Sequence, residues 1–175
     1  MDFNADYFSL LDLPRRFFLD AAQLDARYRA ILSEVHPDKF VQSGNAEQRL
    51  SLQWATRLNE AYQILKNPLS RACYLLTLAG HETLIESNTA MPSDFLIEQM
   101  EWREAVFEAR GAGQVDELNV LQQRVKQQME AFYTELARLF DEAEDYQQAA
   151  DGVRRLMFLD KLRADINEAI ALLDE

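Results

Sequence analysis

Apolar residues recur at helical spacing along nearly the whole chain, and this pattern predicts a protein built from amphipathic helices. Helices are expected over 20–35 and 46–65, after a short apolar turn or helix over 6–11. Two such helices with a polar segment between them predict an antiparallel hairpin. Their apolar faces consist of Leu24, Tyr28, Ile31 and Val35 in the first and of Leu50, Trp54, Leu58, Ala61 and Leu65 in the second.

Residues that cap or break helices mark the ends of this hairpin. Asp20 is placed to cap the first helix, because its side chain can accept a hydrogen bond from the first turn. Pro37 ends that helix, since the residue before a proline is pushed out of the helical region. Asn67 and Pro68 break the second helix, and a further short helix is expected over 69–78.

The region from 80 to 92 is polar and aperiodic, which indicates a boundary between two domains. We expect a first domain over 1–80, a linker over 81–92 and a second domain over 93–175. The second domain is predicted to be a three-helix bundle, so the whole chain is all-α, and the middle helix keeps strict 3–4 apolar spacing. The expected helices cover 94–110, 114–140 and 143–173.

The last of these helices changes its apolar face partway along. Two interpretations stay open: the helix passes from one neighbour to another, or it bends near Leu156. The first face consists of Tyr146, Ala150, Val153 and Met157, and the second, nearly opposite, of Leu159, Leu162, Ile166, Ala169 and Leu173.

The helix over 94–110 has two apolar stripes roughly 120° apart. A helix of a small bundle rarely needs two such faces, so the second stripe is either a protein-binding patch or a surface covered by a third helix. Periodicity alone favours the covering helix. The natural core stripe is Phe95, Trp102, Val106 and Ala109, and the second is Leu96, Met100 and Phe107, with Ile97, Glu104 and Glu101 further round.

The excess negative charge is confined to the second half of the chain. The sequence has 30 acidic and 18 basic side chains, a net charge of −12. Residues 1–80 hold nine of each, and the remaining 21 acidic and 9 basic side chains lie in 81–175. We therefore expect the two halves to have different partners. An acidic chain also argues against sequence-independent binding to nucleic acid or to an anionic membrane.

Cysteine usage and the start of the sequence narrow the class further. The single cysteine, Cys73, excludes an internal disulfide and any zinc or iron–sulfur site built from paired cysteines. The chain begins without the basic-then-apolar pattern of a signal peptide, and it has no apolar run of about 18 residues. We expect a soluble protein of the reducing cytoplasm, with no cofactor or metal of its own.

The joint of the hairpin, from His36 to Phe40, contains the residues of the first half that are best suited to chemistry, His36 and Asp38. Taken alone, His36 beside Asp38 is an acid–base pair, a metal ligand with a neighbouring carboxylate, or a polar turn whose side chains satisfy backbone groups. No nucleophile or second ligand lies at a matching spacing, and the only other histidine is His81. We therefore expect no catalysis.

Motifs in both halves resemble known families, and together they cover nearly all of the chain. Those around the joint resemble a J-domain, and those further along resemble the HscB family of J-type co-chaperones of bacterial iron–sulfur cluster assembly. The resemblance implies an L-shaped, two-domain, all-α co-chaperone. The motifs are 7–11, 36–40 and 59–65 for the J-domain and 65–76, 95–104 and 153–162 for the HscB family.

The J-domain resemblance implies that the His-Pro-Asp turn stimulates ATP hydrolysis by a DnaK-type chaperone of the HscA class. Asp25 and Glu34 stand where general J-domains carry basic residues, which suggests a specialised chaperone or a docking less dependent on charge. Without the resemblance, Arg27 and Arg29 are interpreted as a solvated surface. The implied chaperone-binding residues are His36, Pro37, Asp38, Lys39, Tyr28, Arg27 and Arg29.

The HscB resemblance implies that the iron–sulfur scaffold protein IscU docks on the second domain. Burying one apolar side chain contributes about 1.5–3 kcal/mol, whereas an exposed ion pair contributes about 0–1 kcal/mol. We therefore expect apolar residues to hold the scaffold and glutamates to orient it. The implied scaffold-binding residues are Leu96, Ile97, Met100, Glu101, Glu104 and Phe158.

Other functions stay open on the sequence alone. A general J-domain co-chaperone for unfolded client proteins would depend little on Leu96 or Met100 for binding. A small helical enzyme using His36 and Asp38 would turn over substrate without any chaperone. A purely structural bundle would show neither binding nor turnover.

Overall fold

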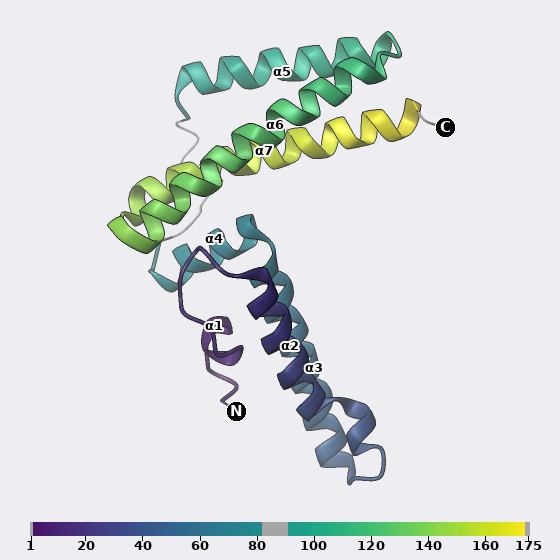
Figure 1. Ribbon diagram of the computed structural model, residues 1–175, viewed down its shortest axis with the longest axis vertical. Helices are drawn as coiled ribbons and strands as arrows, with labels where there is room; N and C mark the ends of the chain where they lie inside the picture. Colours follow the sequence, from purple (N-terminus) through teal and green to yellow (C-terminus); the bar gives the residue numbers. More distant parts are fainter. Residues whose placement is uncertain (1, 82–90, 174–175) are drawn as a thin grey trace. The chain divides into compact units, whose positions relative to one another are not determined.

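Figure 1 shows the computed structural model, which describes residues 2–81 and 91–173. Every regular element in these ranges is a helix, which confirms the all-α prediction. The chain divides into two compact units, residues 1–79 and 80–175. The expected linker over 81–92 lies almost wholly outside the described residues. Within the described ranges, no helix is both long and apolar enough to cross a membrane.

The first unit is organised around α3, which packs against α1, α2 and α4. Helices α2 and α3 lie side by side and antiparallel, which confirms the predicted hairpin (Figure 1). A short 3-10 helix, η1, fills the joint between them. The described elements of this unit are α1 (Tyr7–Leu10), α2 (Ala21–Val35), η1 (Pro37–Phe40), α3 (Asn45–Lys66) and α4 (Pro68–Leu78).

Side-chain caps fix where α2 and α4 begin. The Asp20 carboxylate accepts hydrogen bonds from the backbone N–H groups of Ala22 at 2.8 Å and Gln23 at 3.3 Å, which confirms the predicted cap. At the start of α4, the Asn67 side-chain oxygen accepts from the N–H of Ser70 at 3.0 Å. These bonds satisfy donors that the first turn of a helix leaves open.

Near the joint, fewer residues of the first unit are buried than the periodicity predicts. Leu50, expected in the core, is 47% exposed, and Ile31 and Val35 are half-buried. At this level Ser51 and Trp54 fill the buried face of α3, and Leu50 is turned about 100° away from Ser51. The fully buried large side chains are Phe8, Leu11, Leu24, Leu58, Leu65 and Leu76.

The second unit is the predicted three-helix bundle. Helix α6 packs against both α5 and α7, and α5 also contacts α7 (Figure 1). The 3–4 stripe of α6 is buried as expected at Leu118, Leu121, Val125, Met129 and Leu136, whereas Phe132 in the same stripe is half-buried. The described elements are α5 (Ser93–Gly111), α6 (Val115–Arg138), the π-helical turn η2 (Leu139–Ala143) and α7 (Tyr146–Leu173).

The connection between α6 and α7 differs from the prediction, which continued the middle helix to Phe140. One π-helical turn follows Arg138, and Glu144 then adopts the left-handed conformation, with φ of 51°. The N–H of Asp145 donates to the carbonyl oxygen of Leu139 at 3.0 Å and closes the turn. Periodicity misses this wider turn because Leu139 and Phe140 stay buried within it.

Helix α7 is continuous and packs against both of its neighbours. Leu156, which belongs to neither predicted face, is fully buried and joins them. Buried residues recur mostly every third position, so the buried line turns by about 60° per step around the helix. Three residues of the predicted faces are only half-buried, namely Tyr146, Met157 and Leu173. The line runs through Ala150, Val153, Leu156, Leu159, Leu162, Ile166 and Ala169.

Helix α5 buries one of its two apolar stripes and exposes the other. The core stripe includes Phe95, Val106 and Ala109 as predicted, while Trp102 is half-buried and Gln99, absent from the prediction, is 4% exposed. No described element covers the second stripe, contrary to the covering helix that periodicity favours. The exposed fractions are 37% for Leu96, 57% for Ile97, 71% for Met100 and 78% for Phe107.

Stability measurements should separate the two stripes of α5. We expect Phe95→Ala to lower the free energy of unfolding by about 3–5 kcal/mol, because it removes a buried aromatic side chain. The double substitution of Ile97 and Met100 by alanine should lower it by less than about 1 kcal/mol, because both side chains are largely exposed. Urea unfolding measures both values. A loss of several kcal/mol in the double variant would contradict the exposed stripe.

Acid titration should report on the cap of α1. Burial alone would raise the pKa of Asp6, but hydrogen bonds from Ser9 and Arg15 lower it below its usual value. The charged carboxylate therefore stabilises the fold above the unfolded-state pKa of about 3.9, and this contribution is lost as the pH falls through the folded-state pKa. We expect Asp6→Asn to cost about 1 kcal/mol or less at pH 7 and nothing in strong acid. Urea unfolding across pH tests this, and a pH-independent difference would contradict it.

Candidate functional site

The joint between α2 and α3 is a compact turn built by His36 and Pro37 (Figure 1). His36 leaves the α-helical conformation, and Pro37 opens η1, where no N–H donor is needed. The Nδ1 atom of His36 accepts a hydrogen bond from the N–H of Asp38 at 3.2 Å, so the imidazole caps the short helix. Local hydrogen bonding thus fixes the shape of the turn.

The polar side chains of the turn point towards solvent. His36 is 47% exposed and Asp38 is 86% exposed, with 3.5 Å between Nδ1 and the nearer carboxylate oxygen. Lys39 is also exposed. Among residues 2–81 and 91–173, no group of three or more His, Cys, Asp or Glu is placed to hold a metal ion. The turn therefore presents exposed hydrogen-bonding groups to solvent.

The arginines of α2 lie on the outer surface of the hairpin. Arg27 pairs with Asp12 at 2.9 Å, and Arg29 pairs with Asp25 at 3.8 Å. The arginine side chains are 47% and 80% exposed, so each pair is screened by water and contributes little to stability. Acidic groups of a partner can replace these carboxylates at small cost.

Tyr28 differs from the two arginines because it is half-buried between α2 and α3. Its ring stacks on Tyr62 with 4.2 Å between centroids, and its hydroxyl donates to the side chain of Asn59. The Tyr62 hydroxyl donates to Asp25 at 2.7 Å and accepts from Lys66 at 3.0 Å. Tyr28 therefore holds the hairpin together as well as lining its surface.

The sequence did not predict the hydrogen bonds and stacking that three residues of α3 make beside α2, namely Asn59, Tyr62 and Lys66. A helical wheel of α3 shows that they share a side, but it gives no information on which α2 residue faces them. The register of the two helices decides this, and periodicity in each helix leaves the register open.

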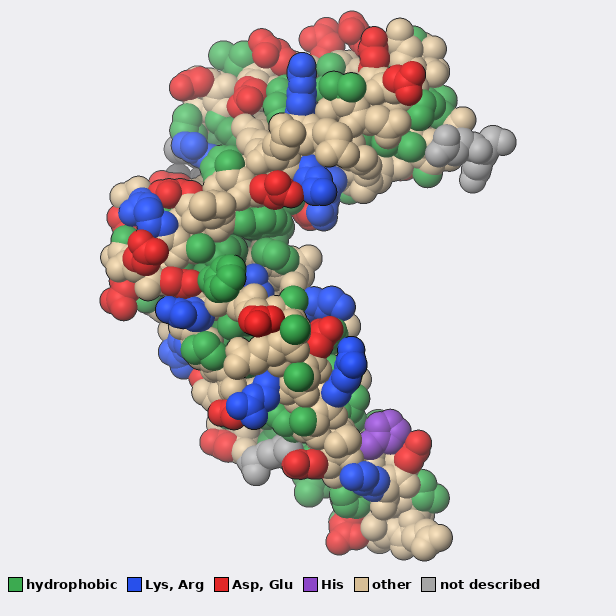
Figure 2. Space-filling model, in the orientation of Figure 1, with side chains coloured by type: hydrophobic (Ala, Val, Ile, Leu, Met, Phe, Trp, Pro, Cys, Tyr) green, Lys and Arg blue, Asp and Glu red, His purple; other side chains and the backbone are tan. Residues whose placement is uncertain are grey.

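The exposed side of α5 combines apolar and acidic groups. Leu96, Ile97 and Met100 lie among Glu101 and Glu104, which are also exposed. Helical geometry spreads these five residues over about 140° of the helix circumference. Figure 2 shows acidic and hydrophobic side chains interspersed over this helix on the face in view. Such a surface suits a partner with an apolar centre and basic surroundings.

Phe158 reaches this side from α7. Its ring meets Phe95 edge to face, with 6.0 Å between centroids and 80° between planes. The guanidinium of Arg155 lies over the same Phe95 ring at 5.8 Å. Phe95 directly precedes Leu96, so Phe158 contacts the residue next to the start of the exposed stripe, and its role in docking stays a prediction.

Two further residues lie near these side chains of α5 and α7 but were not among the predicted scaffold-binding residues. Phe107 extends the exposed stripe towards the end of α5, as its place in the apolar pattern indicates. Arg155 was missed, because an arginine in a helix with a changing apolar face gives no signal of what it contacts.

Comparison with known proteins assigns each unit to a family. Residues 6–74 match the DnaJ domain, and residues 91–167 match the HSCB C-terminal oligomerisation domain. A co-chaperone protein HscB homolog of Azoarcus is 51% identical over 174 residues, which cover 99% of this chain and 98% of the relative. Another from Aromatoleum aromaticum is 47% identical with the same coverage.

Solved structures of the family have the same fold. The chaperone HscB from Vibrio cholerae superposes with a TM-score of 0.82 at 34% identity, covering 97% of this chain and 99% of that one. The human co-chaperone HscB gives a TM-score of 0.89 at 32% identity, covering 96% and 83%. Sequence and fold agree along both units, so the chain belongs to the HscB family of J-type co-chaperones of iron–sulfur cluster assembly.

Proposed function

We propose that this protein stimulates ATP hydrolysis by a DnaK-type chaperone of the HscA class and delivers the iron–sulfur scaffold protein IscU to it. On this proposal it is an adaptor and not an enzyme. It acts in the cytoplasm, holds no cofactor, and has neither nucleic acid nor membrane among its partners. Any cluster belongs to the scaffold.

The observation that carries the proposal is the uncovered stripe of α5. Large side chains such as Met100, which is 71% exposed, have no described neighbour to bury them. Burying each one against a partner would contribute about 1.5–3 kcal/mol before the costs of association. The glutamates beside the stripe would contribute less energy, but they would steer and orient a basic partner.

The turn in the first unit supports the other half of the proposal. A co-chaperone of this kind needs no active site, because it acts by binding one state of the chaperone more tightly than another. His36, Pro37 and Asp38 form a rigid turn that can make such a state-dependent contact. Arg27, Arg29 and Lys39 lie exposed and supply positive charge on the same unit. Tyr28 joins them as a partly exposed residue.

Carrying both sites on one chain explains how delivery couples to hydrolysis. A scaffold bound to the second unit and a chaperone bound to the first are held at a high effective concentration. The scaffold therefore reaches the chaperone at the moment when its hydrolysis is stimulated.

Replacing the histidine of the turn should uncouple stimulation from folding. We expect His36→Gln to reduce stimulation of chaperone ATP hydrolysis to the level seen without this protein, because the turn loses its cap and the imidazole surface. Single-turnover hydrolysis measures this, and circular dichroism checks the fold. Scaffold binding should be unchanged.

The only other histidine offers a matched control. His81→Gln removes an imidazole that lies 5.6 Å from the Tyr146 ring in the second unit, and it should leave stimulation unchanged. Full stimulation by folded His36→Gln, or equal losses in the two variants, would refute the role of the turn.

A further inference from the structure

We propose that the pocket between α6 and α7 receives an acidic side chain of the docked scaffold protein, whose carboxylate is bound by Arg155. This inference rests on the proposed function, because it extends the same docking surface. It assigns a specificity-determining residue and the chemistry of the group that the residue recognises.

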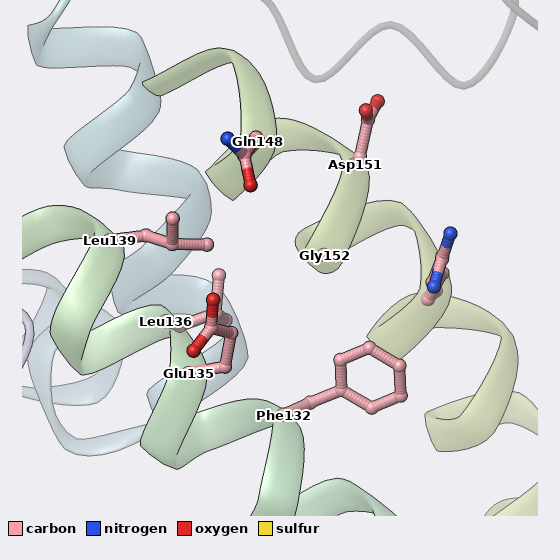
Figure 3. Close-up of a pocket in the computed structure, with 8 residues that line it drawn as sticks. Phe132, Glu135, Leu136, Leu139, Gln148, Asp151 and Gly152 are labelled. Carbon is pink, nitrogen blue, oxygen red and sulfur yellow. The ribbon is translucent and has the colours of Figure 1, made fainter. Parts of the chain in front are cut away.

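The pocket has a volume of about 250 Å³ and lies beside the π-helical turn (Figure 3). Phe132 and Leu136 of α6 and Leu139 of η2 provide its apolar wall, while Gln148 and Asp151 project from α7 on the opposite side. This space is large enough for the end of a partner's side chain.

Glycine at position 152 sets the distance between the two helices at this point. A Cβ atom there would lie 3.2 Å from Cδ2 of Leu136, which is tighter than most Cβ contacts, so the leucine side chain would have to shift by a few tenths of an ångström. Without a side chain at this position, α7 approaches α6 closely beside the pocket.

The carboxylates at the pocket already have basic partners on their own helices. Glu135 accepts hydrogen bonds from Arg138 at 2.6 and 3.0 Å, and this bonding holds the pKa of Glu135 below its usual value. Asp151 pairs with Arg154. Arg155 also lines the pocket, yet no carboxylate in the described parts of the chain lies within ion-pair distance of it. Among the described residues at the pocket, the charge left unmatched is therefore positive.

Arg155 is held ready for an anion. It is half-buried, and its guanidinium rests against the Phe95 ring at 5.8 Å, a cation–π contact that limits its motion. Arginine stays charged at physiological pH and presents its N–H donors in a fork that matches the two oxygens of a carboxylate. An aspartate or glutamate side chain satisfies both the charge and the fork.

The pocket lies close to Phe158 along α7. The Phe95 ring contacts both Arg155 and Phe158, and Phe158 follows Arg155 by three residues on α7. Three helical residues rise by about 4.5 Å, so a partner seated on Phe158 lies within one turn of the pocket. A single acidic group at the edge of an otherwise basic partner would be enough to fill it.

Because the second unit is acidic overall, Arg155 contributes more to discriminating among partner proteins than to attracting them. The many carboxylates of residues 81–175 attract basic proteins without distinguishing among them. A partner that covers the pocket without supplying a carboxylate leaves the guanidinium desolvated and unpaired, which disfavours that complex. Arg155 thereby selects the scaffold from other basic proteins.

Titration calorimetry with the scaffold protein from the same organism tests the inference. We expect Arg155→Gln to weaken binding about tenfold and Arg155→Lys to weaken it less, because lysine keeps the charge but loses the fork. The matched control Arg163→Gln removes the same charge about 12 Å further along α7 and should change the affinity less than about twofold. Thermal unfolding checks each variant.

A second arm identifies the acidic group. Each surface aspartate and glutamate of the scaffold is replaced by its amide and titrated against the native chain and Arg155→Gln. One replacement should weaken binding to the native chain about tenfold and should have no further effect with Arg155→Gln. This pattern would locate the carboxylate that occupies the pocket.

The outcomes distinguish the two levels of the account. No binding by the native chain would refute the proposed function itself. Normal binding by the native chain, with equal affinities for folded Arg155→Gln and Arg163→Gln, would overturn only the pocket. If Arg155→Gln fails to fold, Arg155→Lys decides: native affinity with no coupled scaffold residue would overturn the inference.

Discussion

The second unit depends on one constraint, which is that α5 carries more apolar surface than a three-helix bundle can bury. Helices α6 and α7 cover Phe95, Val106 and Ala109, and this packing holds α5 in place. The same packing leaves Met100 and Phe107 mostly in water. Their exposure contributes nothing to folding, and exposed apolar surface of this kind is typical of protein-binding sites. Packing of the buried stripe of α5 thus leaves its second apolar stripe exposed to solvent.

In the first unit, local contacts hold the turn between α2 and α3 in shape. Pro37 ends α2, His36 caps the short helix that follows, and the stacked rings of Tyr28 and Tyr62 tie α2 to α3. The two units have separate cores, so each can carry a surface of its own. On the proposed function, placing both surfaces on one chain converts two binding events into delivery.

Much of this organisation follows from the sequence, because strong periodicity and clear breakers determine where helices begin and end. The hairpin, the cap at Asp20 and the buried stripe of α6 were all predicted in this way. The exposed stripe of α5 was recognised, but periodicity alone favoured the wrong explanation for it. Whether a face is covered depends on where the neighbouring helices lie, which a single helix pattern does not contain.

The features that the sequence did not predict depend on how one helix packs against or connects to another. The contact of Tyr28 with Tyr62 needs the register of the hairpin, and the cation–π contact of Arg155 needs the crossing of α5 and α7. The π-helical turn after Arg138 inserts a wider turn without changing which residues are apolar. Leu50 was assigned to the core because the pattern assumes a core of uniform width along the hairpin.

The central claim is that scaffold binding on α5 increases chaperone stimulation by the turn. The most direct measurement is single-turnover ATP hydrolysis by the chaperone, with and without scaffold, for the native chain and for a variant with alanine at Leu96, Ile97 and Met100. We predict that the native chain and scaffold together stimulate more than the sum of their separate effects, while the variant keeps only its own stimulation. An equal scaffold effect in the variant, or none in the native chain, would contradict the account and favour a general co-chaperone for unfolded proteins.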